Sequence, residues 1–148
     1  MSYNAGNLAD LESIKALKAR YFRSMDSKDW AALAECFTAD LHADFRLAPG
    51  MLSEGREQYM EDLVAALENA TTVHHGHMPE IEFVDENNAT GTWAMEDIVD
   101  MPGIALRGWG HYHECYRRES GGWRICSIRL TRLRLVINGE VQTLDTRP

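Results

Sequence analysis

Asp26 and His74 are two side chains that could together move a proton, and they lie 48 positions apart in a chain of 148 residues. An imidazole titrates near pH ~6.5, so a neutral histidine can accept a proton at physiological pH. A carboxylate on the far ring nitrogen would fix the tautomer and stabilise the imidazolium that forms. The pair therefore predicts general-base chemistry. The alternative is that Asp26 only ends a helix while His74 packs in the core or faces solvent.

Tyr21 and Arg129 are candidates to hold a substrate oxygen. Tyr21 lies on the apolar stripe of a predicted helix, so its hydroxyl either points into a cavity or finds a partner in the core. We expect Arg129 to be the cavity cation that polarises a carbonyl or carboxylate as charge develops there. Its alternative role is pairing with acidic residues at the surface or at a subunit interface. In a regular strand, the face opposite to that of Arg129 would carry Arg124, Arg132 and Arg134.

The remaining histidines raise the possibility of a metal site. In a strand, His75 and His77 share one face while His74 points to the other. His111 and His113 also share a face, so two His-x-His pairs could meet across a sheet and bind a metal. The carboxylate that such a site normally adds is missing, because the carboxylate next to the second pair points to the other face. We therefore expect a polar sheet face with no metal and no cofactor.

The elements that must position these residues change period once along the chain. The first part has apolar residues at steps of three and four, which predicts helices capped at Asn7 and at Ser27, a short strand over Ala43–Leu47 and a third helix over Arg56–Glu68. From residue 71 the period is two. The predicted strands are Thr71–His77, Glu80–Val84, Ala89–Val99, Ile104–Arg118, Trp123–Ile137 and Val141–Leu144. The pair Asn138-Gly139 predicts a two-residue hairpin. This order predicts one α+β domain over residues 1–148, with the helices on one face of a sheet.

Composition excludes several classes of protein. The chain has 15 basic and 23 acidic side chains, giving a net charge of −8, divided as −12 over residues 1–102 and +4 over residues 103–148. The Arg-rich end could suggest nucleic acid, but the overall negative charge argues against it. No apolar run approaches the ~18 residues of a membrane span, and the start lacks the plan of a signal peptide. Cys36, Cys115 and Cys126 form no CxxC pair. We expect a cytoplasmic protein that binds neither nucleic acid nor membrane.

Three strings of residues carry a resemblance to a known family. They are RYFRSMDSKDW over residues 20–30, TTVHHG over residues 71–76, and GWGHYHECYRRESGGWRI over residues 108–125. In their order and spacing they resemble the SnoaL-like branch of the nuclear transport factor 2-like superfamily, over nearly the whole chain. The resemblance implies three N-terminal helices packed on a strongly curved antiparallel or mixed sheet that forms a cone-shaped pocket.

Within that superfamily the chain is similar to the scytalone dehydratase, bile-acid 7α-dehydratase and hexachlorocyclohexane dehydrochlorinase families. These use an Asp–His pair to remove a proton and expel a leaving group, and Asp26 and His74 fall in the corresponding places. Tyr21, five residues before Asp26, matches a pocket tyrosine of the bile-acid enzymes. Met25 and Val99 stand where scytalone dehydratases carry a tyrosine and a second histidine. The resemblance therefore implies the base but not the substrate of scytalone dehydratases.

We expect a cofactor-independent lyase or isomerase that acts on a small hydrophobic, cyclic, oxygenated molecule. In this hypothesis His74 is the base, Asp26 orients it, and Tyr21 with Arg129 hold the developing oxyanion or leaving group. The alternatives are a non-catalytic ligand-binding or assembly module and a polyketide-cyclase or hydrolase variant, because one fold hosts many functions. The resemblance also implies a homo-oligomer, a trimer first and a dimer second.

Overall fold

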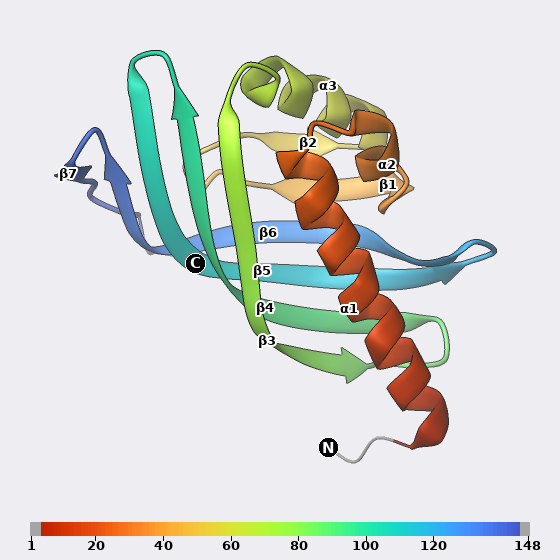
Figure 1. Ribbon diagram of the computed structural model, residues 1–148. Helices are drawn as coiled ribbons and strands as arrows, with labels where there is room; N and C mark the ends of the chain where they lie inside the picture. The colour runs from red at the N-terminus through yellow and green to blue at the C-terminus, as the bar shows by residue number, and fades with distance from the viewer. Residues whose placement is uncertain (1–3, 146–148) are drawn as a thin grey trace.

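The computed structural model describes residues 4–145, which form helices and strands in the predicted order, with the addition of a short strand over Leu52–Glu54 that was not predicted. The helices are α1 (Ala5–Asp26), α2 (Trp30–Ala34) and α3 (Arg56–Leu67). The strands are β1 (Phe37–Asp44), β2 (Leu52–Glu54), β3 (Thr71–Phe83), β4 (Asn88–Met101), β5 (Ile104–Glu119), β6 (Gly122–Ile137) and β7 (Glu140–Val141). Figure 1 shows the long strands bending strongly, with α1 running across them and α2 and α3 gathered beside β1 and β2.

The strands form one mixed sheet. Its order is β2-β1-β6-β5-β4-β3, and β7 adds to β6. Strand β1 pairs with β6 in parallel, while every other pairing in the described residues is antiparallel. The sheet stays open at its β2 and β3 edges. This arrangement confirms the expected α+β class with a strongly curved mixed sheet.

Two of the predicted helix starts were wrong by a few residues. Helix α1 is capped by Asn4, whose side chain accepts from the N–H of Asn7 over 2.9 Å, so Asn7 already lies inside the first turn. Helix α2 is capped by Asp29, whose carboxylate accepts from the N–H of Ala32 over 3.1 Å. Each true cap meets the N–H group three residues on, the standard capping contact. Ser27 instead follows the last residue of α1.

The strands differ from the prediction mainly at their ends and at one bend. Of the strand expected over Ala43–Leu47, only Ala43 and Asp44 lie in β1, which begins at Phe37. Of the strand expected over Val141–Leu144, only Val141 lies in β7. The two strands expected around residues 71–84 are one strand, β3, with an irregular register between His77 and Glu80. The predicted hairpin turn is confirmed, since Asn138 and Gly139 both have positive φ, 53° and 82°.

The core lies between the helices and the face of the sheet that they cover. Its fully buried members include Ile14, Leu17 and Tyr21 of α1, Phe37 of β1 and Ile128 of β6. The C-terminal half of α1 therefore packs against the sheet, and this packing fixes the position of its last residue, Asp26. Within the described residues, no helix is long and apolar enough to cross a membrane.

Candidate functional site

Asp26 and His74 meet where the end of α1 lies beside β3. His74 Nδ1 is 2.7 Å from Asp26 Oδ1, and the backbone N–H of His74 donates to Asp26 Oδ2 over 2.8 Å. The His74 side chain is 7 % exposed, whereas that of Asp26 is 25 % exposed. Because Nδ1 is engaged by the carboxylate, Nε2 is the nitrogen left to exchange a proton with another molecule.

A threonine and a lysine complete the surroundings of the Asp26 carboxylate. The Thr72 hydroxyl donates to Asp26 Oδ1 over 2.9 Å and accepts from Lys28 Nζ over 2.8 Å. Burial alone would raise the pKa of Asp26, but the hydrogen bonds from His74 and Thr72 outweigh it and lower that pKa from its ordinary value. The carboxyl group is therefore ionised at neutral pH, as an imidazole-orienting group must be.

Phe22 forms a wall next to the imidazole. Its ring is nearly parallel to that of His74, with centroids 6.5 Å apart and 16° between the planes. A Cβ atom at Gly76 would lie 2.7 Å from Phe22 Cε2. Because Gly76 has no side chain, the ring of Phe22 in α1 can lie against β3 at this point.

Tyr21 is buried between α1 and the sheet. Its ring lies edge-on to Phe22 and to Tyr112, with centroids 5.4 and 6.0 Å away. Burial first, and then the neighbouring Tyr112, Tyr59 and Glu114, raise the pKa of Tyr21 well above its ordinary value. The phenol therefore stays protonated and can act as a hydrogen-bond donor, but not as a base, at working pH.

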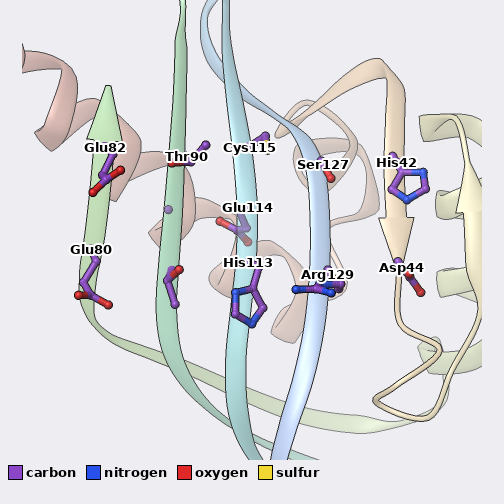
Figure 2. Close-up of a pocket in the computed structure, with 12 residues that line it drawn as sticks. His42, Asp44, Glu80, Glu82, Thr90, His113, Glu114, Cys115, Ser127 and Arg129 are labelled. Atoms are coloured by element: carbon purple, nitrogen blue, oxygen red, sulfur yellow. The ribbon is translucent and has the colours of Figure 1, made fainter. Parts of the chain in front are cut away.

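Arg129 differs from the expectation, because its side chain lies on the outer face of the sheet. It is exposed between the buried Ile128 and Leu130, and Figure 2 shows it beside His113 with the helices behind the strands. Trp123 and Ile125 are buried at odd-numbered positions, so uniform alternation would bury residue 129 as well. An extra residue, Cys126, interrupts the β5–β6 register and reverses the face that odd-numbered residues take.

Arg132 is the β6 arginine that lies among buried groups. Its Nη1 and Nη2 donate to the two carboxylate oxygens of Asp97 over 2.6 and 3.0 Å, and its Nε donates to the carbonyl oxygen of Ala48 over 3.0 Å. The two side chains are only 5 % and 6 % exposed. Asp97 is the direct cross-strand partner of His74 in the β3–β4 register. The ion pair therefore borders the strand position that carries the imidazole.

Asp97 and Arg132 were not predicted as site residues, although two features of the sequence indicate a buried ion pair. Asp97 continues the inward alternation of Trp93 and Met95, so an acid stands where an apolar residue is expected. A Cβ atom at Gly108 would lie 2.1 Å from Arg132 Nη1 and 2.4 Å from Asp97 Oδ1. A glycine inside a strand often marks such a close approach.

The other histidines of the predicted pairs lie apart from the dyad. His75 faces outward next to Glu96, with 3.6 Å between His75 Nδ1 and the carboxylate, and His113 Nε2 is 3.0 Å from the Thr131 hydroxyl. His77 and His111 flank Ala94 in the register. Over residues 4–145, no group of three or more His, Cys, Asp or Glu side chains is placed to hold a metal ion.

Two hollows of the described surface lie away from the dyad. One, of about 610 Å³, lies on the outer face and is lined by residues that include Arg129, Glu80 and Glu82 (Figure 2). Another, of about 730 Å³, lies near the start of α1 beside Arg118. The expected cone-shaped pocket beside His74 is not among these two. The ring of Phe22 lies against His74 there, and the rings of Tyr21 and Tyr112 pack against Phe22.

Comparisons with known proteins agree with the fold. A profile of the SnoaL-like domain matches residues 6–129. A protein of unknown function from Mycobacterium tuberculosis superposes with a TM-score of 0.74 at 29 % identity, covering 87 % of this chain and 75 % of its own. A candidate scytalone dehydratase from Novosphingobium aromaticivorans superposes with a TM-score of 0.80 at 21 % identity, covering 97 % of both chains. A hexachlorocyclohexane dehydrochlorinase from Novosphingobium barchaimii gives 0.77 at 16 % identity, covering 95 % and 97 %.

Proposed function

The chain belongs to the SnoaL-like domain family, and on this premise we propose that it is a cofactor-independent lyase or isomerase of the dehydratase type. The observation that carries the proposal is the contact of 2.7 Å between His74 Nδ1 and the ionised Asp26 carboxylate. The solved structures named for a scytalone dehydratase and a dehydrochlorinase support the same class of reaction. The substrate class we propose is a small hydrophobic, cyclic, oxygenated molecule, because Phe22 lies against the imidazole and the rings of Tyr21 and Tyr112 pack against Phe22.

In the proposed reaction His74 Nε2 removes a proton alpha or vinylogous to a carbonyl group. The electron pair of the broken C–H bond moves into the conjugated system. It then either expels a hydroxyl group, which takes the proton from the His74 imidazolium and leaves as water, or forms a new C–H bond at another carbon with that same proton. Asp26 holds the imidazole and stabilises its protonated form. Tyr21 donates a hydrogen bond to the oxygen that gains negative charge.

We assign the cationic role to Arg132 in place of Arg129. Arg132 forms an ion pair with Asp97, which is the cross-strand partner of His74, so its charge is balanced. A buried charge acts more strongly on a developing oxyanion than an exposed one, because less water screens it. Arg129, on the outer face, is proposed instead for contacts between subunits.

Substrate binding must make room beside the imidazole. Phe22 and Tyr112 lie 6.0 Å apart by ring centroids, and Phe22 also covers His74. The proposal therefore includes a turn of one of these rings when substrate enters, a side-chain change of a kind common at binding sites.

The test is a turnover screen of hydroxylated cyclic ketones and related carbonyl compounds, followed by absorbance of the conjugated product. The expected result is turnover by the parent chain and none by His74→Ala, with the affinity for the substrate nearly retained. A second candidate, a non-catalytic binding or assembly module, is favoured because Asp26 and His74 line neither of the two hollows described above. That candidate predicts binding without turnover in both proteins.

We also propose that the chain is a homo-oligomer, a trimer before a dimer. The outer face of the sheet exposes the apolar side chains of Val73, Trp109 and Leu133. Covering such a face against copies of the same chain removes apolar surface from water. Light scattering on the purified protein tests this: a mass of one chain at micromolar concentration contradicts it.

A further inference from the structure

An ion pair outside the dyad is completely buried beneath the aromatic rings. Lys18 of α1 and Glu114 of β5 have 0 % exposed side chains, and Lys18 Nζ is hydrogen-bonded to Glu114 Oε1. The other carboxylate oxygen accepts from the Tyr116 hydroxyl over 2.5 Å, and that hydroxyl accepts from Trp93 Nε1 over 2.8 Å. Glu114 is thus anchored on the side away from Lys18, and the pair is a fixed dipole.

The positive end of this dipole lies among aromatic rings. Lys18 Nζ is 3.9 Å from the ring centroid of Tyr21, 3.7 Å from that of Tyr112 and 4.7 Å from that of Phe22. These are cation–π distances, well inside the ~6 Å limit for the interaction. The tyrosine proposed to hold the substrate oxygen and its neighbour on β5 therefore share one buried ammonium group.

A contribution to stability does not explain why the Lys18–Glu114 ion pair is buried. Burial lowers the pKa of Lys18, and the charge of Glu114 only opposes that effect. Replacing a buried ion pair by apolar side chains of similar volume is often neutral or stabilising. The charge of Lys18 has a clearer use in acting on the two phenols that it touches.

We infer that Lys18 is a positioning residue that makes Tyr21 and Tyr112 stronger hydrogen-bond donors to a substrate oxygen that gains negative charge. A cation on the face of a phenol ring attracts electron density from it and so stabilises negative charge on, or hydrogen-bonded to, its oxygen. Glu114 balances the charge from the far side, so the dipole favours the oxyanion without adding net charge to the core. This inference rests on the proposed function of the same site.

The test measures a phenol directly and needs no substrate. Tyr21 is replaced by a polyfluorinated tyrosine, chosen so that its phenol ionises below the pH at which Lys18 loses its proton, and the pKa of this phenol is followed by fluorine NMR. The K18M/E114Q background removes both charges at similar side-chain size. Loss of the Glu114 charge alone would lower this pKa, but the lost ammonium group is in direct contact with the ring, so we expect a net rise of about one unit. A purely structural role for the pair would change stability but leave this pKa in place.

Two controls keep the result specific. The same fluorinated residue at Tyr59, a buried tyrosine with no cation–π contact to Lys18 in the described residues, should show no rise in pKa. This background removes Glu114, whose charge raises the pKa of Tyr59, and takes no ammonium group away from that ring. The surface pair variant E12Q/K15M, which removes an exposed ion pair, should leave the pKa at residue 21 unchanged. If K18M/E114Q does not fold, K18M/E114M removes the same charges with apolar side chains and is measured in the same way.

The inference and the proposed function can fail separately. An unchanged pKa at residue 21 in the folded neutral variants overturns the inference, whether or not the parent chain is an enzyme. Where a substrate is turned over, K18M/E114Q should lower kcat about tenfold with little change in KM, as one pKa unit corresponds to a tenfold change in equilibrium. Lack of turnover by the parent chain contradicts the proposed function and leaves the NMR result standing.

Discussion

The Asp26 carboxylate holds His74 at two points, the ring nitrogen Nδ1 at 2.7 Å and the backbone N–H at 2.8 Å. One oxygen therefore orients the imidazole while the other fixes the strand segment that carries it. Because Asp26 is the last residue of α1, the packing of that helix sets the geometry of the pair. A change at the end of α1 should accordingly affect chemistry as well as stability.

Asp26→Asn should lower turnover by about 10²–10⁴-fold, since the neutral amide neither fixes the required tautomer nor stabilises an imidazolium. Steady-state kinetics with the substrate found by screening measures this. Asp29→Asn is a matched control, because it changes an acid three residues away that caps α2. Equal losses in the two variants would show that the effect is not specific to the dyad.

The Asp26 carboxyl should contribute to stability in a pH-dependent way. Its pKa is lowered in the folded chain, because the hydrogen bonds from His74 and Thr72 outweigh burial. A lowered folded-state pKa adds stability above the unfolded-state pKa of ~3.9 and loses it as the pH falls through the folded value. Urea unfolding of Asp26→Asn and the parent chain should therefore give free energies that converge as the pH falls from 5 toward 3 (about two pH units, spanning the unfolded-state pKa). A constant gap over that range would contradict the pKa direction.

The elements of the fold were predictable because they depend on local patterns. The helix stripe, the period of two after residue 71 and the Asn138-Gly139 turn each fix an element from its own residues. The contact between Asp26 and His74, which are 48 residues apart, was expected from the family resemblance and not from a local pattern. The face of the sheet on which Arg129 lies was not predictable. It depends on Cys126 being an extra residue in β6, and that follows only from how β6 pairs with β5. The pairing of Asp97 with Arg132 likewise depends on register across three strands, which no single segment encodes.

Arg132→Met should destabilise the fold by about 3–5 kcal/mol, because it leaves the Asp97 carboxylate buried without its partner. Chemical unfolding measures this. Arg107→Met is a matched control: Arg107 makes the same two-bond contact to Asp100, but both side chains are about 40 % exposed, so a loss below about 1 kcal/mol is expected. Similar losses would show that burial of the Asp97 pair is not what matters.

Stability and chemistry at Arg132 should separate in a double variant. R132M/D97L removes both charges and should recover most of the lost stability, whereas turnover should stay at least tenfold below the parent value. Arg129→Met, on the outer face, should change turnover less than twofold. Parent-like turnover in the folded double variant would remove Arg132 from the proposed mechanism.

Gly108→Ala should disturb the same pair sterically. The new Cβ would lie 2.1 Å from Arg132 Nη1, so the guanidinium must shift, at a cost of about 1–3 kcal/mol. Gly121→Ala is the control, since its Cβ would meet only Arg124 Nη2, at 3.2 Å. Thermal unfolding of the two variants compares them, and an equal change in Tm would contradict the crowding at Gly108.

The most direct test of His74 as a base is proton exchange, followed by NMR in deuterated water on the substrate identified by screening. The parent chain should replace the proton alpha to the carbonyl with deuterium, whereas His74→Ala, at matched ligand occupancy, should slow the exchange by at least about 10²-fold. Exchange at the parent rate in the His74→Ala protein would contradict the central claim.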